Sequence, residues 1–185
     1  INFRKPRPGE IAEKVLLTGE EDATSFFEKG RAILVEALEA HPEAFGADLQ
    51  DETVRDVEWI GRSAVFGAFD RDRMVGIAGF FKVGSRKSAH MGKLISMYVR
   101  PEARGSGAAL DLVEAVLEHA RGQVIQVHLG VAAGNEAAIR LYRKAGFEIY
   151  GTEPRALFVN GRYLDEHLMV RFLDRGSGEN GSTTS

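Results

Sequence analysis

Two stretches of this sequence place glycines and polar residues at spacings that suit chemistry on a phosphate-bearing substrate. The first, residues 97–110, contains Arg104 and the glycine-rich turn 105–107 between a strand-like and a helix-like run. The second, residues 135–147, contains Tyr142, whose phenol can donate a proton. The chemistry to consider is therefore anion binding followed by proton transfer.

The glycine-rich turn has the features of a pyrophosphate cradle. Glycine lets the backbone approach a ligand closely, and the first amides of a helix lack partners inside it. The positive end of the helix dipole lies at the same place, and Arg104 could add charge-assisted hydrogen bonds. The turn consists of Gly105, Ser106 and Gly107, and it leads directly into the expected helix. A turn that binds nothing is the alternative that a lone Gly-x-Gly leaves open.

Two better-known phosphate motifs do not fit this turn. A P-loop needs Lys followed by Ser or Thr after its last glycine, and Ala108-Ala109 stands there. The dinucleotide fingerprint needs a third glycine where Leu110 stands, in a parallel strand-helix-strand unit. Here the pattern predicts a hairpin before the turn, so the sequence disfavours both nucleotide-binding motifs.

The second stretch predicts a helix with one functional face. Asn135 precedes the helix and can cap it, and Asn135, Ala138 and Tyr142 share a face at spacings of three and four residues. Ala138 leaves room for a slender ligand that would end at the Tyr142 phenol. The alternative is purely structural: a cap, a packing alanine and a core tyrosine.

Apolar periodicity predicts the elements that must position these residues. In chain order they are a strand at 11–18, helices at 20–41 and 51–60, hairpin strands at 64–69 and 74–83, a strand at 93–99, a helix at 107–121 with Leu110, Val113, Val116 and Leu117 on one stripe, a strand at 124–131, a helix at 135–145 closed by Gly146, and strands at 147–151 and 163–172. Residues 1–9 are expected to be irregular.

Composition excludes several classes of protein. The net charge of −3 over 185 residues gives no basic field for nucleic acid or an anionic membrane. Cysteine is absent, which excludes disulfides, thiolate metal sites and a cysteine nucleophile, and no metal is expected. No apolar run approaches the ~20 residues of a membrane span, and the N-terminal residues do not resemble a signal peptide. A cytoplasmic location is therefore expected.

The two stretches together match the signatures of a known family. The acyl-CoA motif Arg/Gln-x-x-Gly-x-Gly/Ala is met by Arg104, Gly107 and Ala109, although glycine is commoner at the last position. The second motif is met by Asn135, Ala138, Leu141, Tyr142, Gly146 and Phe147. On these residues the chain resembles the GCN5-related N-acetyltransferases, the GNAT superfamily. The resemblance implies a mixed α+β fold, with a mostly antiparallel, splayed central sheet flanked by helices. Because the resemblance covers nearly the whole chain, a single domain over residues 1–174 is expected. Residues 175–185 are rich in Gly, Ser and Thr and are expected to form a flexible tail.

The resemblance also implies a binding mode and a reaction. Acetyl-CoA would enter between the splayed central strands, where Met97 and Val99 would offer backbone groups to the pantetheine arm and the thioester carbonyl. The amides at 105–109 would hold the pyrophosphate, and Asn135 would contact the pantetheine or a nearby water. A primary amine would attack the thioester directly, with the Val99 amide as oxyanion donor and Tyr142 as general acid for the departing sulfur.

Several questions stay open at this stage. The general base could be Tyr98, His90, Glu43 or a chain of waters, although strand alternation points Tyr98 away from Met97 and Val99. The acceptor could be a small amine, an amino acid or a protein N-terminus. A catalytically silent acyl-CoA-binding sensor or regulatory module is the alternative function.

The oligomeric state and the acceptor surface are also open. Dimers are common in the family, so a homodimer stays an alternative to a monomer. Arg86, Lys87, Arg155 and Tyr163 could suit an amine that carries a carboxylate, but ordinary solvated surface is the favoured interpretation of these residues.

Overall fold

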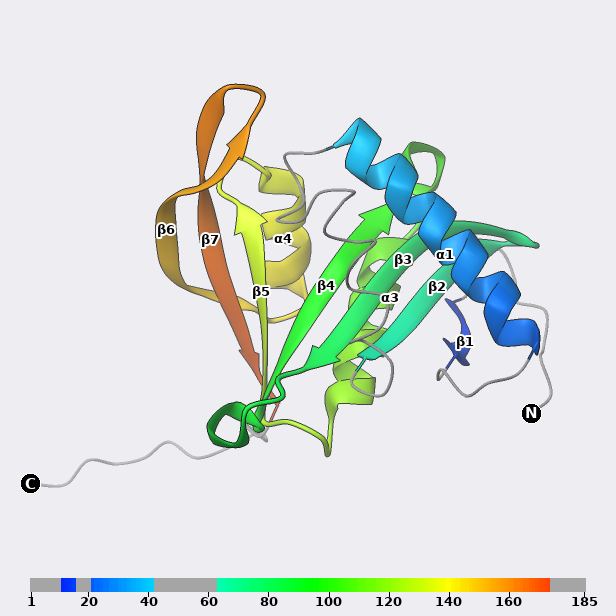
Figure 1. Cartoon of the computed structure of the whole chain (residues 1–185), viewed down its shortest axis with the longest axis horizontal. Coiled ribbons are helices and arrows are strands. Elements are labelled where there is room, and N and C mark those ends of the chain that lie inside the picture. The colour runs from blue at the N-terminus through cyan, green and yellow to red at the C-terminus, as the bar shows by residue number, and fades with distance from the viewer. Residues whose placement is uncertain (1–10, 16–20, 42–62, 174–185) are drawn as a thin grey trace, which may run out of the picture.

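The computed structural model describes residues 11–15, 21–41 and 63–173, with side chains at 28–41 and 64–173 (Figure 1). The elements in chain order are β1 (Ile11–Val15), α1 (Glu21–Ala40), β2 (Ser63–Asp70), β3 (Arg73–Lys82), η2 (Arg86–Ser88), β4 (Met91–Val99), η3 (Pro101–Ala103), α3 (Ala108–Ala120), β5 (Gln126–Ala132), α4 (Glu136–Lys144), β6 (Glu148–Val159) and β7 (Arg162–Phe172). The helix expected at 51–60, the irregular residues 1–9 and the tail at 175–185 lie outside the described residues.

The strands of the described residues form one seven-stranded sheet in the order β1-β2-β3-β4-β5-β7-β6. Neighbouring strands are antiparallel except β4 and β5, which run parallel. Helix α1 crosses one face of the sheet in front of β3 and β4, whereas α3 and α4 lie behind it (Figure 1). The expected mixed, mostly antiparallel α+β fold is confirmed.

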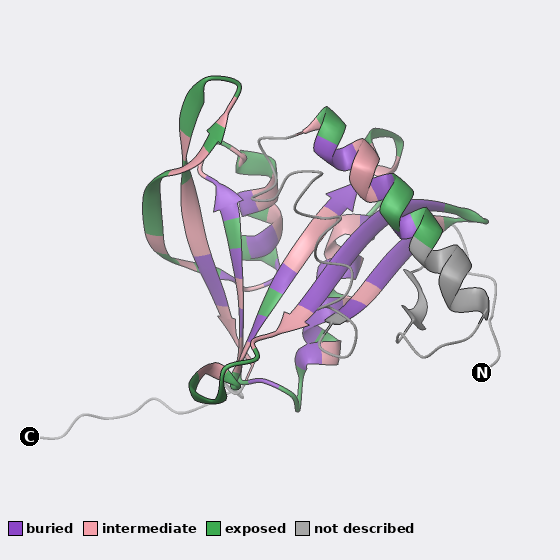
Figure 2. Ribbon diagram, in the orientation of Figure 1, coloured by how far each residue is buried: buried purple, intermediate pink, exposed green. Residues whose placement is uncertain are grey.

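Each face of the sheet has its own apolar core (Figure 2). Behind the sheet, α3 packs against β2, β3 and β4, in a core that also includes Val127, Leu129 and Val131 of β5. In front, Ile33 and Ala37 of α1 cover Met74, Ile77 and Tyr98. We call these sides the α3 face and the α1 face. The α3 stripe differs by one residue from the prediction, because Leu112 is fully buried while Leu110 is only half-buried.

Most predicted elements are confirmed to within a few residues, but β6 is longer than expected. The sequence predicted a strand at 147–151, whereas β6 continues to Val159. Pro154 cannot donate to a sheet ladder, and Arg155 has a φ of 54°, so the strand passes this point through a register shift. The pairing with β7 then resumes at Leu157, and no pattern in the neighbouring residues predicts that it does.

The shorter elements follow from local residue chemistry. The cap at Gly146 is confirmed, because its φ of 80° favours glycine and its amide donates to the Arg143 carbonyl at 2.9 Å. The first strand ends by Val15 among the described residues, and 16–18 lie outside them.

In the described part of the chain, no helix has both the length and the apolar character that a membrane crossing requires.

Candidate functional site

The parallel strands β4 and β5 are paired only at their beginnings. Residues 91–93 of β4 are the Cα partners of residues 126–128 of β5, with Lys93 and His128 as the last pair. Beyond that pair the two strands diverge, as the ribbon shows (Figure 1). Backbone groups on the facing edges of residues 94–99 and 129–132 are therefore not used in pairing β4 with β5. This splayed arrangement is the one that the resemblance implied.

A bulge in β4 shapes the opening between these strands. Ser96 has a φ of 52°, and the register with β3 shifts between the pairs Ile77–Tyr98 and Gly79–Ile95. Beyond the bulge, Val99 packs on the α3 face and Tyr98 on the α1 face, so Tyr98 does point away from Val99 as expected.

The Val99 amide is directed into the opening. The Arg100 amide donates to the Val75 carbonyl on β3 at 2.9 Å. Because antiparallel ladders alternate in the side to which their amides point, the Val99 N–H points to the opposite side, toward β5. An oxygen atom seated between β4 and β5 could accept a hydrogen bond from it.

The loop between η3 and α3 presents backbone amides. Gly105 and Gly107 have φ angles of 80° and 98°, where an L side chain would be strained. Ser106 fixes the loop, since its Oγ donates to the Ala103 carbonyl at 2.7 Å and accepts from the Ala108 amide at 3.3 Å. The amides of Gly105, Gly107 and Ala109 donate to no group within the described residues. This loop at a helix N-terminus therefore fits a diphosphate.

Arg104 is engaged with the protein. Its Nε donates to the Val99 carbonyl at 3.2 Å, and its Nη2 lies 3.1 Å from Nε2 of His41 at the end of α1. A phosphate contact by the guanidinium remains a prediction. The contacts present link the glycine loop to the ends of β4 and α1.

Helix α4 places the second motif behind the sheet. The Asn135 Oδ1 accepts a hydrogen bond from the Ala138 amide at 3.2 Å, so the expected N-cap is present. Ala138 is half-buried, and Tyr142 is buried with its ring packed edge-on against Phe147. Burial raises the pKa of the Tyr142 phenol, which keeps it protonated at neutral pH. The Tyr142 phenol therefore carries its proton at neutral pH, and the raised pKa makes it a weaker acid than a solvent-exposed tyrosine.

Two of the three side-chain base candidates named from the sequence, His90 and Tyr98, are described by the structure, and they do not lie together at the opening. His90 directly precedes β4, and at ~3.3 Å per residue it lies on the order of 20 Å along the strand from the bulge. Tyr98 lies under α1 near His41, and burial, with a smaller effect of Glu36, raises its phenol pKa. Glu43 lies outside the described residues.

Three charged or titratable side chains that the sequence analysis did not single out lie beside the opening. Lys93, His128 and Glu166 share the α1 face, because Val127 and Leu129 point into the opposite core. Burial, followed by the Lys93 and His90 charges, lowers the pKa of His128. Burial, followed by Glu153, raises the pKa of Glu166. The sequence feature that could have pointed to this cluster is Gly130 within β5, because a glycine inside a strand often marks a place where another group approaches the backbone closely.

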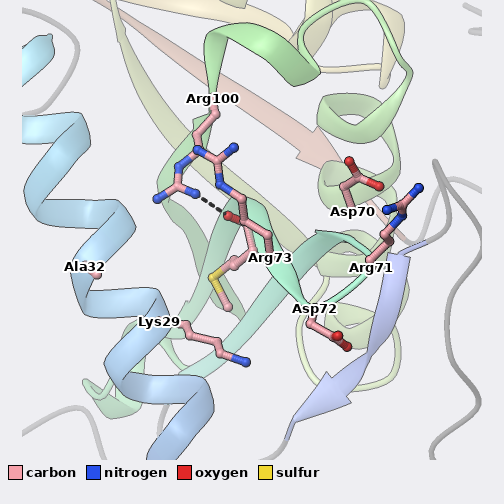
Figure 3. Close-up of a pocket in the computed structure, with 8 residues that line it drawn as sticks. Lys29, Ala32, Asp70, Arg71, Asp72, Arg73 and Arg100 are labelled. Carbon is pink, nitrogen blue, oxygen red and sulfur yellow. Dashed lines mark hydrogen bonds between the residues drawn. The ribbon is translucent and has the colours of Figure 1, made fainter.

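A separate open hollow of about 550 Å³ lies between α1 and the β2–β3 turn (Figure 3). Its charged lining consists of four basic side chains and two carboxylates, Lys29, Arg71, Arg73, Arg100, Asp70 and Asp72. Two of the guanidinium groups already pair with carboxylates outside this lining. Arg100 Nη2 is 2.8 Å from Glu36, and Arg73 Nη2 is 2.8 Å from Glu102. The first pair joins the end of β4 to α1, and the second joins the start of β3 to η3. These ion pairs therefore hold neighbouring elements together.

Comparison with known proteins places the chain in a family. The sequence model of the Acetyltransferase (GNAT) family matches residues 34–147, which include β4, the glycine loop, β5 and α4. The fold and the two motifs agree with that match. The chain belongs to the Acetyltransferase (GNAT) family.

Individual relatives and structures agree with this assignment. The chain is 41% identical over 80 residues to L-methionine sulfoximine/L-methionine sulfone acetyltransferase of Pseudomonas aeruginosa, covering 43% of this chain and 46% of that protein. It is 32% identical over 157 residues to mycothiol acetyltransferase of Nocardiopsis dassonvillei, covering 78% of this chain and 46% of that one. The chain thus spans about half the length of these curated relatives. The structure of Arabidopsis thaliana NAA60 in complex with acetyl-CoA shares the fold, with a TM-score of 0.63 and 21% identity over 77% of this chain and 94% of that chain.

Proposed function

We propose that this protein transfers an acetyl group from acetyl-CoA to a primary amine by direct attack. The observation that carries the proposal is the juxtaposition of two sets of unused amides. Those of Gly105, Gly107 and Ala109 lie at the start of α3, and that of Val99 points into the opening between β4 and β5. The first set suits a diphosphate and the second suits a carbonyl oxygen that gains negative charge.

The roles of the residues follow from these positions. Acetyl-CoA, when bound, supplies a thioester whose carbon is open to attack by an amine. The amides of Gly105, Gly107 and Ala109 hold the diphosphate, and the edges of Met97 and Val99 align the arm that follows it. The Val99 N–H donates to the carbonyl oxygen, and Tyr142, kept protonated by its burial, donates a proton toward the sulfur.

The names of the relatives support an amine acceptor. One curated relative is named for acetylation of amino acid derivatives, L-methionine sulfoximine and L-methionine sulfone. The NAA60 structure was determined with acetyl-CoA bound. We propose acetyl-CoA as the cosubstrate here, with the acceptor among amines of low molecular mass or exposed N-termini.

The test combines calorimetry with a thiol-release assay. Coenzyme A and acetyl-CoA are titrated into the protein, and free thiol is then followed over a panel of amines, amino acids and short peptides. Binding together with amine-dependent thiol release supports the proposal. Binding without release on any amine favours the silent acyl-CoA-binding module, and absence of binding overturns both functions.

A further inference from the structure

We propose that Glu166 of β7 is the general base that removes the proton from the acceptor amine. This inference rests on the proposed acetyl transfer and names a catalytic residue for it. An alkylammonium group has a pKa near ~10, so the acceptor must lose a proton before its nitrogen can attack. The group that takes the proton must be unprotonated at neutral pH and must lie beside the opening between β4 and β5.

The Glu166 carboxylate lies over the backbone of β5 at Gly130. A Cβ built on Gly130 would be 2.5 Å from Cδ and Oε1 of Glu166 and 2.6 Å from its Oε2. The carboxylate therefore occupies the space that a side chain at position 130 would need. Gly130 comes two residues after His128, the last residue of β5 paired with β4. The carboxylate consequently lies at the border of the opening, on the α1 face.

The proposed acid and base lie on opposite sides of the sheet. Tyr142 belongs to the core on the α3 face, together with Val127 and Leu129 of β5. Gly130 and the Glu166 carboxylate are on the other face, because side chains alternate along a strand. An amine that approaches from the α1 face would meet Glu166, and a sulfur that departs on the α3 face would meet Tyr142. The two proton transfers are thereby separated in space.

Burial and neighbouring charges raise the pKa of the Glu166 carboxyl, which makes its carboxylate a stronger base. Burial raises the pKa of Glu166, and Glu153, its Cα partner on β6, raises it further. Lys93 on β4 acts in the opposite direction. His128 lies on the same face of β5, and its own pKa is lowered chiefly by burial, which favours the neutral ring. A carboxylate with an elevated pKa accepts a proton more readily while it is still ionised near neutral pH.

The step balances without another reagent. One proton of the ammonium nitrogen moves to a carboxylate oxygen of Glu166, and the freed lone pair forms the new N–C bond. The nitrogen then loses a second proton to solvent, which leaves the neutral amide. The C–S bond of the thioester breaks, and the sulfur takes its electron pair and the Tyr142 proton. Solvent exchange then returns a proton to Tyr142 and removes one from Glu166, which is only partly buried.

The test measures kcat/KM against pH with the best amine of the panel. Glu166→Gln keeps the shape of the side chain but cannot accept the proton, so we expect kcat/KM at neutral pH to fall by about 10²-fold. The deficit should shrink as the pH rises toward the pKa of the amine, because the free amine then needs no base. Affinity for acetyl-CoA, measured by calorimetry, should stay within about twofold.

Two further variants separate a catalytic role from a structural one. Glu153→Gln removes a neighbouring negative charge and should shift the acidic limb of the profile to lower pH, while the plateau rate is retained. Gly130→Ala leaves Glu166 in the chain but displaces its flexible carboxylate, so the loss of kcat/KM should resemble that of Glu166→Gln. Thermal unfolding verifies that each variant is folded.

The outcomes distinguish this inference from the function on which it rests. If the wild-type protein releases no thiol with any amine, the proposed function fails and the inference is overturned with it. If the wild type is active and Glu166→Gln stays within twofold of it across the pH range, only the inference is wrong. A loss in Glu166→Gln that is constant over pH, or that is matched by a loss of acetyl-CoA binding, assigns Glu166 a structural role and also overturns the inference.

Discussion

Arg104 donates its Nε–H to the carbonyl of Val99 across 3.2 Å, which fastens the start of the glycine loop to the last residue of β4. The same guanidinium reaches Nε2 of His41 at the end of α1. Arg104 therefore connects the proposed diphosphate cradle to the strand that would orient the thioester. Its structural contacts and any phosphate contact can be separated by experiment.

Arg104→Met should weaken coenzyme A binding by about tenfold, since a hydrogen bond from a charged group contributes about 1.5–3 kcal/mol. If the guanidinium only fastens the loop, the salt dependence of the binding constant will be the same in wild type and variant. Direct phosphate contact would instead make the variant less sensitive to salt. Calorimetry at several salt concentrations measures both effects. Arg121→Met, at an exposed pair with Glu118, is the matched control.

Gly107→Ala should impair coenzyme A binding through the backbone. Its φ of 98° costs an L residue about 1–2 kcal/mol, so the loop will shift and its amides will no longer converge. We expect the dissociation constant for coenzyme A to rise at least about tenfold. Gly122→Ala is the control, because Gly122 has a φ of 75° in open space at the turn after α3. It should lose similar stability but bind coenzyme A normally; equal affinities in the two variants would contradict the cradle.

Tyr142→Phe should lower kcat while it leaves acetyl-CoA affinity nearly unchanged. The variant keeps the ring that packs against Phe147 and removes only the hydroxyl. A general acid typically contributes on the order of 10²-fold, so a decrease of that size is expected. Steady-state kinetics and calorimetry provide the two measurements. An unchanged kcat would remove Tyr142 from the mechanism.

His128 should make the protein less stable in mild acid. Burial lowers its pKa in the folded protein, and the Lys93 charge lowers it further, whereas the unfolded chain binds the proton near pH ~6.5. The unfolded state therefore gains the proton first, and the free energy of unfolding falls as the pH drops below ~6.5. The decline ends once the pH is below the lowered pKa of the folded protein.

The contact with Gln126 gives a suitable replacement for His128. The Gln126 Nε2 lies 2.9 Å from Nε2 of His128, and an amide nitrogen can only donate, so the neutral ring is the acceptor. His128→Gln should reduce the slope of stability against pH in this window, as measured by urea unfolding at several pH values. Identical slopes in wild type and variant would show that His128 does not contribute.

The sequence determined much of this protein through local chemistry. The glycines at 105 and 107, the Asn135 cap and Gly146 each act within a few residues of themselves, so their positions could be read from the chain. Strand alternation likewise placed Tyr98 and Val99 on opposite faces. The predicted sites for Met97, Asn135 and Tyr142 in acetyl-CoA binding stay predictions, because they concern a ligand.

The tertiary structure decided what depends on contacts between distant residues. The Arg104 guanidinium finds the Val99 carbonyl and His41, 63 positions away, and no local pattern indicates that partnership. Glu166 looked like an ordinary strand residue, and only the pairing of β5 with β7 brings its carboxylate over Gly130. The sequence also did not predict the full length of β6, because the pairing of β6 with β7 resumes only after an irregular stretch. Local conformational preferences are encoded in short segments, whereas these features arise only when the whole sheet has assembled.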